Sequence, residues 1–170
     1  MKKLMVIITI AAAVCGCVAN KPTPKGVDSL TTEDINIMVG CSIEKINRGV
    51  NRGMIPRKSP NVRIVAKIQP FEVLNLPTDA RVKEIVSELE MRLCKELTDG
   101  GRFLFPDAPC GAALGVTLQP DCILKGKLSC VINENGGFST SEFRLKLTIV
   151  DVRTGNVAWD GNVVLGKTNE

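Results

Sequence analysis

In three segments near the carboxyl end of the chain, apolar side chains recur at every second position and most of the others are polar. The apolar side chains take the even positions of residues 122–130 and the odd positions of residues 143–150 and 157–165. A period of two predicts strands with one packed face and one solvated face. The turn sequences Asn135-Gly136-Gly137 and Thr154-Gly155-Asn156 separate the three segments, so we expect an antiparallel three-stranded meander.

Two amphipathic helices are expected upstream of this meander. Thr31 and Asp34 resemble a capping box at the start of a helix over residues 32–48, and Gly49 would end it. The second helix spans residues 79–98 and stops at Gly100-Gly101. The inward positions of the first helix are Ile35, Met38, Val39, Ser42 and Ile46, and those of the second are Val82, Ile85, Val86, Leu89, Leu93 and Leu97.

The remaining segments complete a single domain over residues 30–170. Residues 62–68 alternate as a strand, residues 70–77 form a proline-bounded loop, and residues 102–105 form a short strand. Residues 112–118 could form a stunted helix that Pro120 closes. We therefore predict a two-layer α+β fold, in which both helices pack on one face of a mostly antiparallel sheet.

The first sixteen residues have the pattern of an export signal. Lys2 and Lys3 precede an apolar run over residues 4–14, which is too short for the ~20 residues of a transmembrane helix. Val14-Cys15-Gly16-Cys17 then resembles a bacterial lipobox, in which Gly16 favours cleavage before Cys17 rather than before Cys15. We predict a lipoprotein signal peptide over residues 1–16 and a membrane anchor through acyl chains on Cys17. The alternative is an ordinary secretory signal with two incidental cysteines.

Residues 17–29 read as a lipidated tether, because the segment is polar and carries prolines and a glycine. Fully extended, residues 18–29 would reach about 40 Å. Val18 rather than aspartate follows the acceptor cysteine. That residue favours delivery to the outer membrane, with the domain facing the periplasm.

The cysteines downstream of the tether are Cys41, Cys94, Cys110, Cys122 and Cys130. Export would permit disulfides, but an odd number leaves at least one thiol unpaired. Four of them fall on apolar positions of the expected elements, where a free cysteine behaves as a small hydrophobic residue. One bridge from Cys110 to Cys122 or Cys130 is the alternative.

Composition argues against several classes of function. The chain carries 22 Lys and Arg against 18 Asp and Glu, without the strongly basic balance of a nucleic-acid-binding domain. It has no histidine, no tyrosine and no CxxC pair, so we expect no zinc or other metal site. Glu84, Glu88 and Glu90 read as a solvated helix face, and Cys110 lacks an activating histidine. We predict no catalytic residues, no cofactor and no small-molecule substrate.

The solvated face of the meander is the candidate binding surface. Strand parity places Lys125, Lys127, Arg144 and Lys146 on it, with Asp160 and Asn162 on the third strand. Arg63 and Lys67 would join them if their strand pairs in the same sheet. Such residues are ordinary on a wet strand face, but they could also dock an acidic patch of a partner. Trp159 shares the parity of the apolar positions, so we expect it in the core.

Several stretches together resemble a known family. They are the lipobox, the strand 64–68 followed by Pro70-Phe71-Glu72, the helix end 97–103, residues 118–126 and the closing run 145–159. Over residues 30–165 this pattern resembles the LpoB-type family of penicillin-binding-protein activator lipoproteins. Related outer-membrane lipoproteins and the N-terminal domain of TolB share similar patterns.

The resemblance implies a TolB N-terminal-domain-like fold and an outer-membrane lipoprotein that binds a class A penicillin-binding protein. By protein–protein contact such a protein stimulates the synthase's glycan polymerisation and crosslinking. Residues 106–120 and the tether are both shorter here than in the best-known members of the family. The alternative is a structural or assembly lipoprotein of another envelope complex, such as a secretion or surface-organelle system.

Overall fold

The computed structural model describes residues 30–59, 61–76, 80–107, 118–135 and 138–169. The predicted signal peptide, Cys17, the tether and Cys110 lie outside the described residues, as does nearly all of the expected helix over residues 112–118. The elements are α1 (Thr32–Asn51), β1 (Ile64–Ile68), β2 (Glu72–Leu74), α2 (Ala80–Asp99), β3 (Phe103–Leu104), β4 (Cys122–Asn135), β5 (Phe138–Asp151) and β6 (Val157–Asn169).

Helix α1 begins with the predicted capping box and runs past its predicted end. The backbone N–H of Asp34 donates to the Thr31 hydroxyl at 3.2 Å, and the N–H of Thr31 donates to the Asp34 carboxylate at 2.8 Å. All five predicted inward positions are buried. Gly49 does not end the helix, which continues to Asn51. Gly53, with a φ of 69°, supplies the left-handed residue beyond the end.

Helix α2 matches its prediction closely. Its six predicted inward side chains are buried, together with Cys94, so one stripe faces the sheet. Gly101, with a φ of 73°, takes the left-handed conformation just after the helix, and the chain turns there into β3. The predicted strand over residues 102–105 is reduced to the two residues of β3.

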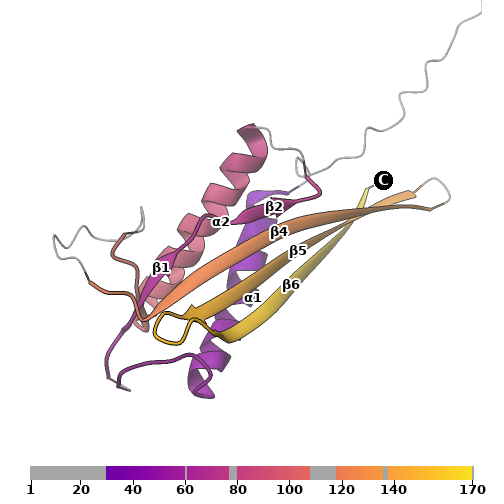
Figure 1. Ribbon diagram of the computed structural model, residues 1–170. Helices are drawn as coiled ribbons and strands as arrows, with labels where there is room; N and C mark the ends of the chain where they lie inside the picture. The colour runs from indigo at the N-terminus through magenta and orange to yellow at the C-terminus, as the bar shows by residue number, and fades with distance from the viewer. Residues whose placement is uncertain (1–29, 60, 77–79, 108–117, 136–137, 170) are drawn as a thin grey trace, which may run out of the picture.

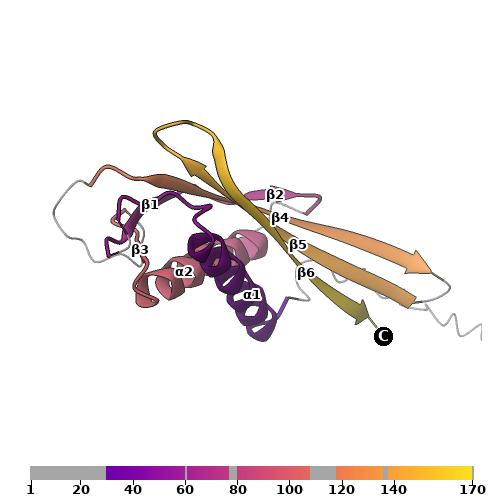
Figure 2. The same ribbon diagram turned by 90° about the horizontal axis from the view of Figure 1, so that it is seen from below.

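The strands form one mixed sheet in the order β3-β1-β4-β5-β6, with β2 also paired to β4. β4, β5 and β6 make the predicted antiparallel meander. β1 pairs in parallel with both β3 and β4, and β2 pairs in parallel with β4. The parallel pairing of β1 with β3 follows from α2, which carries the chain back (Figure 1) so that β3 enters beside β1 in the same direction (Figure 2).

Strand β2 lies within the segment that we expected to be a loop. β1 pairs with β4 at Cys122–Leu124 and β2 pairs with β4 further along, at Lys127–Ser129. Pro70 stands between them and has no backbone N–H to donate, so it interrupts what would otherwise be one continuous strand. Phe71 then turns inward, and its N–H donates to the Glu90 carboxylate of α2 at 2.5 Å.

The meander strands are longer than the alternating segments that predicted them. The register places Asn135 opposite Phe138 at one end of the β4–β5 hairpin and Cys122 opposite Asp151 at the other. Between β5 and β6 the register shifts near Ile149 and Val150, at a bulge. Val157 was expected in the core with Trp159, but it lies beyond this bulge and is 59% exposed.

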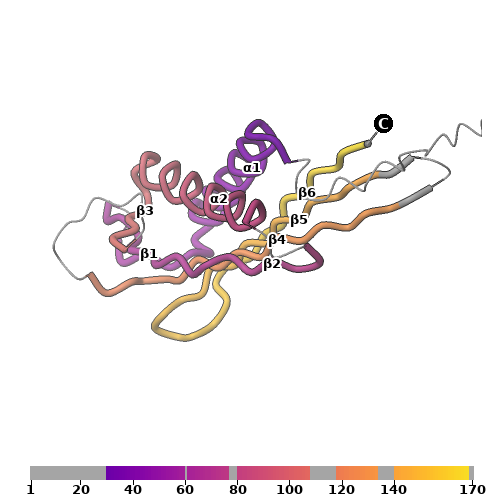
Figure 3. The backbone as a smooth tube through the Cα atoms, turned by 90° about the horizontal axis from the view of Figure 1, so that it is seen from above, coloured from indigo at the N-terminus to yellow at the C-terminus, as the bar shows by residue number. Residues whose placement is uncertain are grey.

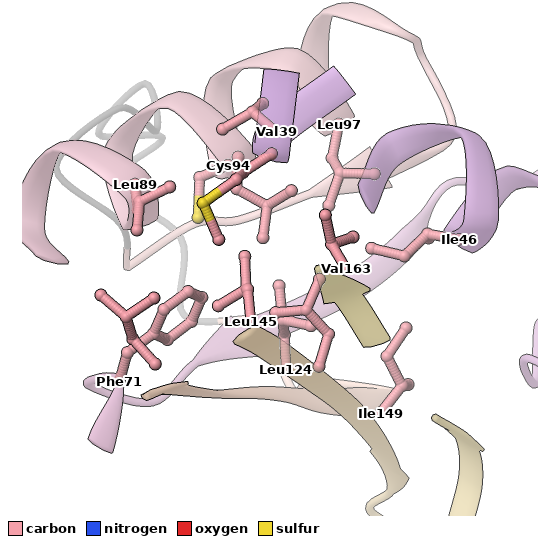
Figure 4. Close-up of a cluster of buried hydrophobic side chains, with 14 of the residues drawn as sticks. Val39, Ile46, Phe71, Leu89, Cys94, Leu97, Leu124, Leu145, Ile149 and Val163 are labelled. Carbon is pink, nitrogen blue, oxygen red and sulfur yellow. The ribbon is translucent and has the colours of Figure 1, made fainter. Parts of the chain in front are cut away.

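Both helices lie on the same side of the sheet, as predicted for a two-layer α+β fold (Figure 2). The tube in Figure 3 shows the β5–β6 turn projecting to the opposite side. Side chains from the two layers form one core, in which Val39 and Ile46 of α1 and Leu89 of α2 face Leu124, Leu145 and Val163 of the strands (Figure 4).

Glycines allow two aromatic rings to approach the backbone in this core. A Cβ on Gly126 would lie 2.4 Å from the ring of Phe71, so only glycine fits under that ring. Trp159 is 7% exposed, as predicted for a core residue. A Cβ on Gly49 or on Gly161 would lie 2.7 Å from its indole ring, so the ring packs against backbone from both α1 and β6.

Neither described helix is long and apolar enough to cross a membrane.

Candidate functional site

The four predicted partner-binding cations all lie on the sheet face that points away from the helices. On β4 and β5 the buried side chains are those with core parity, which leaves Lys125, Lys127, Arg144 and Lys146 on the opposite face. The register sets Lys127 directly opposite Lys146, and it sets Arg144 opposite Ser129. The structure therefore brings the four predicted residues together, and we call them the cationic face.

Three of these cations line a shallow hollow of about 330 Å³. Its other lining residues come from all three meander strands and are Ser129, Glu142, Asn162 and Val164. Val164 is 55% exposed and adds an apolar contact surface to the hollow. Lys125 extends the face along β4, and Lys67 of β1 extends it sideways, because Lys67 pairs with Ile123 in the same sheet. Arg63, which we considered for this face, lies before β1 begins.

Two of the four cations are engaged by carboxylates of the protein itself. The Lys127 ammonium lies 2.8 Å from the Glu72 carboxylate, and Arg144 is paired with Glu142. The hydrogen bond and the charge of Lys127 hold the pKa of Glu72 below its usual value, with a smaller contribution from Lys125. Glu72 lies on β2, the strand that the sequence pattern did not predict. Lys125 and Lys146 have no such partner within the described part of the chain.

The cysteines are less uniform than expected. Cys94, Cys122 and Cys130 are buried, as predicted for core thiols, and Cys122 and Cys130 are free. Cys41 is exposed on α1, so the prediction of a fourth core position was wrong. Burial, aided by the charges of Asp121 and Asp151, raises the pKa of Cys122 to about 12. Burial also raises the pKa of Cys130, so neither thiol is a ready nucleophile.

The carboxylates of α2 are engaged in structural contacts. Glu84 pairs with Arg81 at 3.0 Å and Glu88 pairs with Arg92 at 2.6 Å. Glu90 was expected on the solvated face, but it is half-buried and accepts the N–H of Phe71. Among the described residues no cluster of three or more acidic or cysteine side chains could hold a metal ion.

A larger cleft, of about 610 Å³, lies at the end of the sheet where β4 begins and β5 ends. Three segments that are far apart in the sequence line it: residues 56–58, 119–121 and 151–153. None of these residues belongs to the binding surface that strand parity predicts. Each segment contributes a loop without periodicity, and the cleft exists only once the sheet has brought the three loops together.

No protein-family model matches this chain, and no curated protein matches it in sequence. Similar folds occur among solved structures. The C-terminal domain of LpoB from Escherichia coli is 13% identical, with a TM-score of 0.44, and the match covers 78% of this chain and 98% of that one. The lipoprotein GNA1162 from Neisseria meningitidis is 16% identical, with a TM-score of 0.43, over 62% of this chain and 83% of that one.

A further similar structure is the putative neuraminyllactose-binding hemagglutinin homolog from Helicobacter pylori. It is 16% identical, with a TM-score of 0.42, and the match covers 67% of this chain and 71% of that one. These likenesses concern the fold alone.

Proposed function

We propose that this protein is a non-catalytic lipoprotein of the outer membrane that binds and activates a class A penicillin-binding protein. Its lipid on Cys17 holds the domain at the membrane, and the domain acts by contact on the synthase in the periplasm. The sequence pattern over residues 30–165 supports this assignment, because it resembles the LpoB-type activators.

The observation that carries the proposal is the cationic face. Lys125 and Lys146 project from the sheet without an ion-pair partner in the described structure, and Lys146 lines the hollow together with the exposed apolar side chain of Val164. An interface of this kind gains orientation and association rate from charge, and it gains affinity from the apolar contact. We infer that an acidic patch of the synthase docks here.

Charge reversal on the cationic face tests this proposal. Lys127→Glu with Arg144→Glu should weaken capture of the synthase steeply. Because those two residues also hold Glu72 and Glu142, Lys125→Glu with Lys146→Glu is the cleaner pair. We expect either pair to reduce capture by about tenfold or more at low salt. The measurement is a crosslinked pull-down from envelope with the acylated protein as bait, followed by quantification of the class A penicillin-binding proteins.

The matched control reverses two exposed cations on other surfaces, Lys83→Glu with Arg52→Glu, and should leave capture unchanged. Circular dichroism establishes that each variant is folded. Undiminished capture by the folded Lys125→Glu, Lys146→Glu protein would exclude the cationic face. If the wild type captures a secretion channel or other lipoproteins instead of a synthase, the protein is an assembly subunit and the activator proposal fails.

A further inference from the structure

The cleft at the end of the sheet has a rigid frame. The N–H of Asp121 donates to the Val65 carbonyl at 2.7 Å, and the N–H of Val65 returns a bond to the Asp121 carboxylate at 3.0 Å. The N–H of Val152 donates to the Asp121 carbonyl at 3.1 Å, which ties the wall after β5 to the wall before β4. The frame is therefore held by the sheet that it borders.

Both carboxylates in the cleft are engaged within the protein. Asp121 accepts the Val65 N–H and lies 2.9 Å from the Lys58 ammonium. Asp151 is 9% exposed, and one of its oxygens accepts the N–H groups of Arg153 at 2.8 Å and Thr154 at 3.1 Å. Both carboxylates therefore stabilise the loops that line the cleft.

The two arginines of the cleft, unlike Lys58, are not paired with any described carboxylate. Arg57 and Arg153 both line it and both are exposed, and neither guanidinium has a hydrogen-bond or ion-pair partner among the described residues. Arg57 also lines a small adjoining hollow together with Arg63 and Arg102. Two of the three segments that line the cleft therefore each contribute a guanidinium group.

Part of the lining of the cleft is apolar. Pro56 and Pro120 line the cleft, and Val152 beside them is 44% exposed. Guanidinium groups bind carboxylates through paired, planar hydrogen bonds, and proline and valine surfaces favour a ligand with apolar groups next to its charge. A bare inorganic anion would use only the arginines. The volume also falls in the range of ~300–1,000 Å³ that is usual for small-ligand sites.

From this geometry we infer that the cleft binds a short peptide through a free carboxylate, held between Arg57 and Arg153, with an apolar side chain against Pro56, Pro120 and Val152. The site is separate from the cationic face, so the inference stands whether or not a penicillin-binding protein docks there. Such a peptide could come from a protein segment of L-residues or from a cell-wall stem peptide of alternating L- and D-residues.

The test is calorimetric titration of the mature acylated protein, in detergent, with the pentapeptide Ala-Glu-Lys-Ala-Ala. The peptide is used in an all-L form and in a stem-peptide form, which has D-residues at positions two, four and five and a glutamate joined to lysine through its γ-carboxyl. Each form is used with a free or an amidated carboxyl end. We expect one of the free acids to bind and its amide to bind at least about tenfold more weakly. The form that binds more tightly identifies the source of the natural ligand.

Arg57→Gln and Arg153→Gln should each weaken binding of the free acid about tenfold. Arg52→Gln is the matched control, because it removes an exposed arginine at the same end of the molecule but outside the cleft. If Arg52→Gln weakened binding of the free acid as much as Arg57→Gln does, the effect would be general electrostatic attraction of the peptide to this end of the protein. That result would overturn the site. Failure of both peptide forms to bind, or equal binding of acid and amide, would overturn it as well.

Discussion

Burial separates the described cysteine side chains into two chemical kinds. Cys41 is exposed on α1, whereas Cys122 and Cys130 are enclosed by the core at the sheet. Burial raises the pKa of both enclosed thiols, and in Cys122 the neighbouring carboxylates raise it further, to about 12. Since the thiolate is the reactive form, these two side chains serve as small apolar residues in the folded protein.

Alkylation should therefore distinguish these cysteines. With iodoacetamide at pH 8, we expect Cys41 to be modified in the native protein, and Cys122 and Cys130 only after unfolding in denaturant. Mass spectrometry of the digested protein assigns each modified position. Modification of native Cys122 at the rate of Cys41 would show that the β4 core opens under native conditions.

Asp34 is a second residue whose ionisation bears on stability. Burial opposes its ionised form, but hydrogen bonds from Lys167 and Thr31, with the charge of Lys167, outweigh burial and lower its pKa. A lowered folded-state pKa means that the carboxylate stabilises the fold above the unfolded-state value, near 3.8. This stabilisation is lost as the pH falls through the folded-state pKa.

Asp34→Asn should lower the free energy of unfolding by about 1–2 kcal/mol at pH 7, because it weakens the capping box and removes the ion pair. The difference from wild type should shrink as the pH falls from 3.8 through the lower folded-state pKa, because the folded wild-type carboxylate becomes protonated only there. Urea unfolding at pH 7 and below pH 3.8 measures this difference in the free energy of unfolding. The control is Glu33→Gln, in the same helical turn. A deficit that is independent of pH would contradict the assigned role of the charge.

At the scale of elements, the prediction that Gly49 ends α1 was wrong. Gly49 was predicted as a helix stop because glycine commonly follows the last helical turn. The structure shows that this glycine is required by Trp159, whose indole ring packs against it within α1. The reason lies on β6, so no pattern within the helix could have revealed it.

Two glycines of α1 should respond in opposite ways to substitution by alanine. Gly49→Ala would place a methyl group 2.7 Å from the Trp159 ring, and we expect a loss of about 1–3 kcal/mol. Gly40→Ala meets nothing within 4 Å and should stabilise the helix by up to about 1 kcal/mol. Because Trp159 is the only tryptophan, its fluorescence during urea unfolding reports both variants. Equal effects of the two alanines would contradict the packing of the indole ring on Gly49.

The meander and both helices could be predicted because each has a clear hydrophobic period. Strand β2 could not, because it is three residues long and follows Pro70. Its omission had a consequence for the site, since Glu72 on β2 neutralises Lys127. Strand parity placed the cationic face correctly, but it could not tell which of its cations already have partners.

At the scale of the whole molecule, the described structure has two distinct ends. Asp34 at the start of α1 is bonded to Lys167 near the end of β6, so the chain enters and leaves the domain at the same end. The cleft lies at the other end, because its lining residues precede β4 and follow β5. In Figure 1 the β5–β6 turn and the end of α1 are found at that end. The cleft and the point where the described chain begins therefore lie at opposite ends of the domain.

The order of pairing in the sheet has a consequence for how the chain acquires this structure. β4 pairs with β5 through a local hairpin, but it also pairs with β1 and β2, which precede it by the whole of α2. A chain synthesised from its amino end therefore contains the residues of both helices and of β1, β2 and β3 before β4, the strand with which β1 and β2 pair, has been made. Contacts between distant parts of a chain form slowly. We expect productive folding to wait for Cys122–Asn135, and the chain to expose its apolar helix faces until then.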